Sequence, residues 1–231
     1  MKKLLFLAVV FAVAVSVGNS VVVADTGSLA GKIIALDAGH GSSATDTGAV
    51  NLLYGVAEAD VNRDVVQALQ EKLTSYGAHV VVANRLPARR DRVDDVAAKC
   101  AGVDVTGDSV ADNKKCDVLV AVHHNGSTDT AHDGTLTIYT QNSDKPLAKA
   151  LYDSLLPLTN RPEGLLNGGY GMTVYKNLVS TITEAYYITS DAEAEQYVNN
   201  HAAQIGKEVD AQVLGVANYF TALASGGKKG R

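Results

Sequence analysis

The sequence predicts a single α/β domain, in which a mostly parallel, twisted sheet is covered by helices on both faces. Short runs that are apolar throughout recur along the chain, as is typical of strands buried on both sides. Segments with apolar residues every three or four positions separate these runs and predict amphipathic helices. The chain has 231 residues, 46% of them hydrophobic, which is enough for one sizeable core.

The N-terminus has the features of a secretory signal peptide. Two lysines precede an apolar run at 4–17, and small residues lead to Ala24, the expected last residue removed. A membrane span needs about 20 apolar residues, and this run is shorter. Residues 21–23 would lengthen it, so an uncleaved membrane anchor is the alternative. We expect residues 1–24 to be removed, and the protein to be exported to the periplasm or the cell exterior without stable membrane insertion.

The first half of the mature chain alternates between the two patterns. The run at 29–36 predicts a strand, and the polar, glycine-containing stretch at 42–54 predicts a loop. Residues 58–76 are expected to form a helix, because apolar side chains recur every four positions before the stop signal of Gly77. The valine-rich run at 78–83 predicts the next strand.

The middle of the chain contains both cysteines. The charged segment 85–99 is expected to begin as a loop and continue as a helix, and 118–122 predicts another buried strand. Cys100 and Cys116 flank a Gly- and Asp-rich stretch, 101–113, which reads as an insertion. In an exported protein two thiols more often pair than stay free, so we expect a disulfide between them.

The last part of the chain is expected to complete the sheet and cover it. The remaining elements are a strand at 135–139, a helix at 146–158, a loop at 159–170, strands at 172–175 and 180–188, and one long helix at 191–224. The domain should therefore span residues 25–225, followed by a disordered tail at 226–231. The formal net charge of −5 does not favour nucleic acid or an anionic membrane as a partner.

Residues 33–41 deliver one imidazole to the end of the first strand. Four apolar residues are followed by Asp37, and His40 then lies between two glycines. The glycines permit a tight turn and leave the ring uncrowded. This histidine is a candidate metal ligand, and the alternative is a turn residue that merely ends the strand. Asp37 either orients a ligand or is a simple strand-end acid.

Two more candidates are expected at the same edge of the sheet. In parallel α/β sheets, ligands bind beyond the carboxyl ends of the strands. His123 follows a predicted strand, and Glu58 begins the helix after the first long loop. Two imidazoles and one carboxylate with an open fourth position make a catalytic zinc site. His124 is the alternative to His123, because either histidine can turn inward at a strand end.

Glu184 is the candidate for a further carboxylate, which such a site needs to hold the attacking water and pass its proton to the leaving group. It lies near the end of a predicted strand and precedes an aromatic patch that would exclude water. Taken singly, Glu58 also fits a helix-start acid and Glu184 a solvated strand residue.

Together these stretches resemble the catalytic domain of the zinc-dependent N-acetylmuramoyl-L-alanine amidases of type 3. The resemblance runs from about Gly31 to Ala222 and is carried by residues 36–41, 48–49, 55–62, 84–85, 117–125, 184–187 and 218–220. It implies a phosphorylase/hydrolase-like sheet, one Zn²⁺ per chain, and peptidoglycan as the substrate.

Carried over residue by residue, the resemblance implies His40, Glu58 and His123 as zinc ligands and Glu184 as the catalytic carboxylate. His123 is preferred over His124 because of its offset from the asparagine in the family's Ser-Ile-His-x-Asn pattern. The chain departs from the family pattern at Asn84, Ala121 and 185–187, which leaves details of substrate recognition open.

Some members of the family carry a helical insert that plugs the zinc site. The segment 141–170 is too short for both its predicted helix and such a plug, so we expect an open site. The arginines at 85, 89, 90 and 92 can meet substrate carboxylates, although a solvated charge run is the commoner interpretation. His132 and His201 are expected to be solvated.

The leading functional prediction is hydrolysis of the amide between N-acetylmuramic acid and L-alanine in peptidoglycan. The alternatives are another zinc amidohydrolase or peptidase on the same scaffold, and a non-catalytic cell-wall binder that would have lost a ligand or the carboxylate. We expect a monomer without a separate wall-binding domain.

Overall fold

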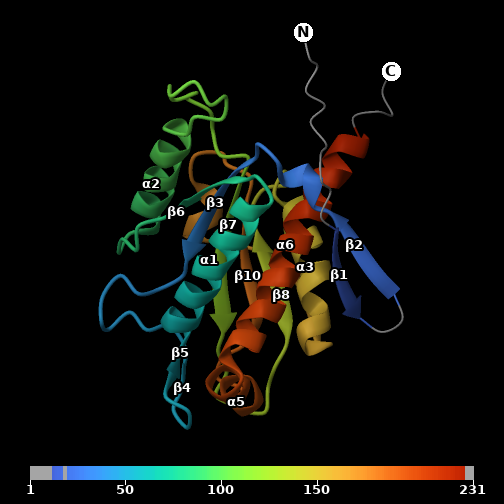
Figure 1. The fold of residues 1–231 in the computed structure, drawn as a ribbon. Coiled ribbons are helices and arrows are strands. Elements are labelled where there is room, and N and C mark those ends of the chain that lie inside the picture. Colours follow the sequence, from blue (N-terminus) through green and yellow to red (C-terminus); the bar gives the residue numbers. More distant parts are fainter. Residues whose placement is uncertain (1–11, 18–19, 227–231) are drawn as a thin grey trace.

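The computed structural model describes residues 12–17 and 20–226. Its centre is a six-stranded sheet in the order β6–β3–β7–β10–β8–β9 (Figure 1). The strands are β3 (Ile33–Ala38), β6 (His79–Val82), β7 (Val118–Asn125), β8 (Thr135–Tyr139), β9 (Pro162–Asn167) and β10 (Ser180–Tyr187). The first four strands in this order run parallel, β8 is antiparallel to β10, and β9 is parallel to β8. The mostly parallel sheet is therefore confirmed.

Helices cover both faces of the sheet, as predicted. One face carries α1 (Glu58–Ser75), α3 (Lys145–Thr159) and α6 (His201–Gly226), and the other carries α2 (Arg89–Ala101) and the short α4 (Gly171–Val174). Alternate residues of β3 serve the two cores: Ile34 and Leu36 pack in the first, whereas Ile33 and Ala35 pack in the second. This division explains why the central strands are apolar throughout.

Two expectations for the second half of the chain were wrong. Residues 159–170 are not a loop, because Pro162–Asn167 pair with β8 and form the edge strand β9. Met172–Tyr175 are not a strand, because α4 occupies Gly171–Val174. An edge strand is held by backbone hydrogen bonds along one side and can stay largely exposed. Its sequence therefore lacks the apolar pattern from which strands are predicted.

The single closing helix predicted over 191–224 is two helices. Asn200, with φ of −133° and ψ of 38°, separates α5 (Asp191–Asn199) from α6. Val198, which lies on α5 and fits the apolar spacing of the predicted long helix, is 51% exposed. The apolar spacing continues across the break, so periodicity could not reveal a change of direction.

Smaller elements complete the fold. The stretch expected to be a loop at 42–54 contributes β4 (Val50–Asn51), which pairs with β5 (Val56–Ala57). A 3-10 turn, Thr26–Leu29, precedes β3. Among the described residues, no helix combines the length and apolar character that a membrane span requires.

The N-terminal hairpin belongs almost entirely to the expected signal peptide. β1 (Ala12–Val17) and β2 (Ser20–Asp25) pair with each other outside the six-stranded sheet, and β2 contacts α6. Residues 1–11 and 18–19 of the expected leader, and 227–231 of the expected tail, lie outside the described residues. Removal of the leader therefore stays a prediction.

The expected disulfide joins Cys100, in the last turn of α2, to Cys116, just before β7. Both residues are buried, and the loop between them lies at the end of the sheet opposite to β4 and β5 (Figure 1). The bond closes a loop with a sequence separation of 16 residues. A covalent link of this span restricts the unfolded chain and also ties α2 to the sheet.

Replacing both cysteines by serine is expected to lower the free energy of unfolding by about 3 kcal/mol. Urea denaturation of the oxidised wild type and of the Cys100→Ser/Cys116→Ser variant measures this difference. Under reducing conditions the two proteins should differ by much less, since the wild type then lacks the bond as well. Equal midpoints under oxidising conditions would show that the disulfide does not stabilise the fold.

Candidate metal centre

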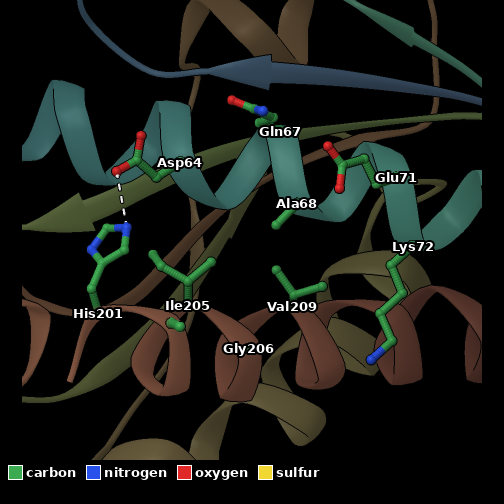
Figure 2. A pocket seen from close by; sticks show the side chains of 10 residues that line it. Asp64, Gln67, Ala68, Glu71, Lys72, His201, Ile205, Gly206 and Val209 are labelled. Carbon is green, nitrogen blue, oxygen red and sulfur yellow. Dashed lines mark ion pairs between the residues drawn. The ribbon is translucent and has the colours of Figure 1, made fainter.

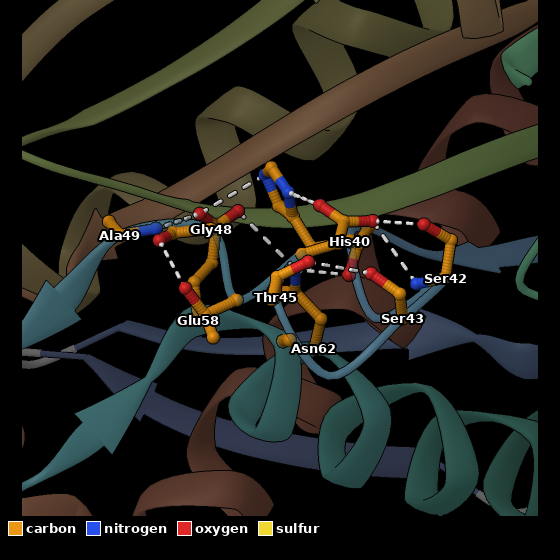
Figure 3. Close-up of polar contacts among 12 residues, drawn as sticks. His40, Ser42, Ser43, Thr45, Gly48, Ala49, Glu58 and Asn62 are labelled. Carbon is orange, nitrogen blue, oxygen red and sulfur yellow. Dashed lines mark hydrogen bonds and ion pairs between the residues drawn. The ribbon is translucent and has the colours of Figure 1, made fainter. Parts of the chain in front are cut away.

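Three side chains from distant parts of the chain meet near the carboxyl ends of β3 and β7. One nitrogen each of His40 and His123 and one oxygen of Glu58 all lie within 4.8 Å of one another. Glu58 Oε2 is 3.3 Å from His40 Nε2, and Glu58 Oε1 is 3.0 Å from His123 Nδ1. In Figure 3, His40 and Glu58 lie close together, with Gly48 and Ala49 beside Glu58. The structure thus assembles the three residues that the sequence proposed as ligands.

His40 is held in an unusual backbone conformation at the end of β3. Its φ of 61° lies in the left-handed region, where a residue with a β-carbon is strained. Its Nδ1 is 2.8 Å from Asp46 Oδ1, so the ring donates there as an N–H and leaves the Nε2 lone pair facing Glu58. Asp46 also accepts hydrogen bonds from Ser42, and these bonds, with that of His40, lower the pKa of Asp46.

Two arginines secure the turn that carries His40. Arg85 Nε donates to the carbonyl oxygen of His40 at 3.0 Å, and Arg92 Nη2 donates to the same oxygen at 3.1 Å. Arg92 is buried and also pairs with Asp37 at 3.2 Å. The expectation of a solvated charge run was therefore wrong for Arg85 and Arg92. Asp37 forms its ion pair with Arg92 and is hydrogen-bonded to neither imidazole, so it holds Arg92 in place.

Glu58 is the first residue of α1, which places its carboxylate at the positive end of the helix. Ala49 N–H donates to its Oε2 at 2.9 Å, and Asn62 Nδ2 lies 3.3 Å from its Oε1. Burial by itself would raise the pKa of Glu58, but the hydrogen bond and charge of His123 and the charge of His40 lower it to about 2. The carboxylate is therefore ionised at neutral pH.

His123 and Glu184 lie side by side on adjacent strands. They are register partners in the parallel pair of β7 and β10, so both side chains project from the same face of the sheet. On the other side, Gly39 faces His123, and a β-carbon at Gly39 would lie 2.3 Å from the imidazole. The glycine is thus required because the ring occupies the space that any side chain would fill.

The carboxyl group of Glu184 has one unsatisfied oxygen. Its Oε2 is buried and has no hydrogen-bond partner. Burial, and then the negative charges of Glu58 and Glu163, raise the pKa of Glu184 well above its ordinary value. A buried carboxylate oxygen without a partner indicates a missing group, such as a cation or a polarised water, next to it.

His124 points away from the cluster into the opposite core. Its Nδ1 is 2.7 Å from Asn62 Oδ1, and its Nε2 is 2.9 Å from Glu208 Oε2 on α6. His124 and Glu208 are both buried, and Tyr186 stacks on the imidazole with ring centroids 4.4 Å apart. Since β7 continues to Asn125 instead of ending at 122, strand alternation separates the two neighbouring histidines.

The donor set suits a zinc ion. Two imidazole nitrogens and one carboxylate oxygen are the ligands of a catalytic zinc site with an open position. Glu184, the register partner of His123 on the neighbouring strand, adds a buried oxygen without a partner. All four residues were proposed from the sequence. Sequence reasoning assigned no role to Asp46, Asn62 and Glu208. Asn62 carried a detectable signal, four residues after Glu58 on one helix face, whereas Asp46 lies in an aperiodic loop.

A glycine in the loop before α1 leaves room for the donor atoms. A β-carbon at Gly48 would lie 2.3 Å from Glu58 Oε2 and 2.7 Å from His40 Cδ2. Gly55 has a similar φ, 66° against 67° at Gly48, but nothing lies within 4 Å of its β-carbon position. A side chain at either position strains the backbone, but only a side chain at Gly48 also crowds the donor atoms. Comparing substitutions at the two glycines therefore separates these effects.

Gly48→Ala is expected to weaken zinc binding by about tenfold or more, because it displaces a carboxylate and an imidazole. Gly55→Ala should share only the backbone cost, about 1 kcal/mol of stability. Zinc competition with a chromophoric chelator and urea denaturation measure the two effects separately. Equal zinc affinity in both variants would mean that the donors accommodate the extra methyl group.

Two hollows in the surface differ in their chemistry. A pocket of about 180 Å³ is lined by His40, His123 and Asp46 together with residues of α2 and α4. A wider hollow of about 720 Å³ lies between α1 and α6, where Ala68, Ile205 and Val209 face one another (Figure 2). The wider hollow contains none of the four candidate residues, so the smaller pocket is the candidate substrate site.

Comparisons with known proteins identify the family to which the chain is similar. The sequence profile of a family described as N-acetylmuramoyl-L-alanine amidase matches residues 34–213, a range that includes all four candidate residues. A search of curated protein sequences finds no match.

Several solved amidase structures have the same fold. The catalytic domain of CwlV, an N-acetylmuramoyl-L-alanine amidase from Bacillus (Paenibacillus) polymyxa var. colistinus, is similar with a TM-score of 0.66 and 22% identity, over 82% of this chain and 98% of that domain. The amidase AmiC2 of Nostoc punctiforme has a TM-score of 0.66 and 18% identity, over 83% and 98% of the two chains. An amidase from Clostridium difficile 630 has a TM-score of 0.65 and 21% identity, over 82% and 97%.

Proposed function

Because this chain belongs to the N-acetylmuramoyl-L-alanine amidase family, we propose that it hydrolyses the amide between N-acetylmuramic acid and L-alanine in peptidoglycan with the aid of one zinc ion. His40, Glu58 and His123 would hold the ion, and Glu184 would serve as the catalytic carboxylate. The observation that carries the proposal is the convergence of these three donors, with Glu184 and its unpartnered oxygen on the strand next to His123.

The chemistry divides between the ion and the protein. When bound, zinc supplies a Lewis acid that lowers the pKa of a water molecule to about 7 and polarises a carbonyl oxygen. Glu184, next to His123 on the neighbouring strand, would accept a proton from the attacking water. The same carboxyl group would then donate the proton to the amine of L-alanine as the amide bond breaks. A nearby cation would also favour the ionised form of Glu184, which burial alone opposes.

Neighbouring residues hold the donor side chains in fixed orientations without a bound ion. Asp46 orients the ring of His40, and the amide N–H of Ala49 orients the carboxylate of Glu58. Ligands fixed in this way lose little freedom on binding a metal. The segment 141–170 is occupied by α3 and β9, and none of its residues lines the pocket beside the donors. This supports a site that needs no activator to open it.

We also propose that the mature protein works outside the cytoplasmic membrane. Its proposed substrate lies there, residues 1–24 have the features of a signal peptide, and a buried disulfide is typical of exported proteins. The expected monomeric state stays a prediction.

Mass spectrometry of purified sacculi digested by the protein tests the proposal. We expect free stem peptides with a new L-alanine amino terminus, loss of these products with a chelator, and their return on addition of zinc. Cleavage at another amide would instead favour a different zinc amidohydrolase or peptidase. Binding to sacculi without any product would favour the non-catalytic cell-wall binder.

A further inference from the structure

Arg89 is a free cation at the candidate substrate pocket. It begins α2, is exposed, and lines the pocket of about 180 Å³ together with His40 and His123. Among the described residues it is the only arginine whose guanidinium group has no hydrogen bond or ion pair. The others have the following partners: Arg63 with Asp60, Arg85 with His40, Arg90 with Asp94, Arg92 with Asp37, and Arg161 with Ala131.

The aliphatic part of Arg89 is nevertheless held in place. A β-carbon built on Gly171, at the start of α4, would lie 2.7 Å from both Cβ and Cδ of Arg89. The side chain therefore passes closely over the backbone of α4. This packing reduces the entropy lost when the guanidinium binds a ligand.

The charges around the pocket leave Arg89 uncompensated. Asp37 is paired with Arg92 at 3.2 Å, and Asp46 is paired with His40 at 2.8 Å. No acid that lines the pocket remains for Arg89. The positive end of α2 adds to its charge, so this part of the pocket favours an anion.

The proposed substrate carries free carboxylates only on the peptide side of the scissile amide. In a muropeptide, the lactyl carboxyl group is consumed by the scissile amide, so free carboxylates occur only in the peptide. The carboxylate nearest to that amide belongs to the second stem residue, a glutamate joined through its side chain, which can also occur as the amide. A planar guanidinium binds a carboxylate through two parallel hydrogen bonds, and an amide cannot replace this pairing.

We propose that Arg89 binds the free carboxylate of the second stem residue and makes the enzyme prefer the acidic form of the stem peptide over the amidated form. This inference rests on the proposed function. The inference goes beyond the proposed function because it assigns a residue that determines substrate specificity.

Two substrates and three proteins test the inference. The substrates are two N-acetylmuramoyl tripeptides in which the side-chain carboxyl group of the second residue is joined to a third residue with an amidated C-terminus. They differ only in whether the second residue carries a free carboxylate or its amide. The proteins are the zinc-loaded wild type, Arg89→Gln and Arg90→Gln. We expect the wild type to cleave the acid with a kcat/KM about tenfold higher than the amide. Arg89→Gln should lose this preference through a slower reaction with the acid alone. Arg90→Gln, one position away and paired with Asp94 at 3.9 Å, should keep the preference.

The outcomes separate the inference from the proposed function. A wild type that cleaves both substrates equally, or an Arg89→Gln variant that keeps the preference, would overturn the role of Arg89 and leave the amidase activity intact. A zinc-loaded wild type that cleaves neither substrate would contradict the proposed function itself. Arg89→Lys should keep part of the preference, because it retains the charge but not the paired donors.

Discussion

Glu184→Gln is expected to reduce turnover by at least about a thousandfold while zinc remains bound. The substitution keeps the shape of the side chain but removes its ability to accept and return a proton. Its Oε2 is not one of the three clustered donors, so the ion should not depend on it. Release of stem peptides from sacculi measures turnover, and atomic absorption of the purified variant measures zinc.

Folding of this variant should be unimpaired. Burial raises the pKa of Glu184, so ionising it in the metal-free folded protein costs stability, and that cost grows as pH rises from the ordinary value towards the folded one. A neutral glutamine removes the cost, and the metal-free variant should be at least as stable as the metal-free wild type at pH 7. Glu195→Gln, at an exposed position of α5, should retain full activity as a control. Wild-type turnover by Glu184→Gln would exclude the carboxylate as the proton carrier.

His123→Ala and His124→Ala are expected to fail in opposite ways. Loss of His123 removes one of the three donors, so zinc affinity should fall by at least about 100-fold while the fold persists. Loss of His124 leaves the carboxylate of Glu208 buried without its partner, which should cost about 3–5 kcal/mol of stability. Chelator competition and urea denaturation of both variants measure the two effects.

A second substitution distinguishes the buried pair from a general loss of packing. In His124→Ala/Glu208→Gln the uncompensated charge is gone, so part of the lost stability should return. Gln212, which donates to Glu208 at 3.3 Å, remains available to the new amide. If His124→Ala lost zinc and His123→Ala lost only stability, the assignment of the two histidines would be reversed.

The sequence by itself determined the fold class and indicated His40, Glu58, Glu184 and one of two neighbouring histidines as the residues of the candidate site. Apolar runs separated by helical periodicities predict a parallel sheet covered on both faces, and that sheet is present. In such a sheet the ends of neighbouring strands meet at one edge, so His40 and His123 could be placed together without knowing any contact. Glu58 followed because it begins the helix after the first strand. The disulfide followed from the number of cysteines and the expected export of the protein.

Only the tertiary structure decided features that depend on contacts between distant segments. The edge strand β9 forms because β8 offers unpaired backbone groups, which no side-chain pattern records. The choice between His123 and His124 depends on where β7 ends, a boundary that sequence patterns locate poorly. Arg85 and Arg92 form part of a charged run in the sequence, yet they are bound to the turn around His40. Periodicity reports which face of an element is buried, whereas the partner of a buried polar group is set by the packing of whole elements.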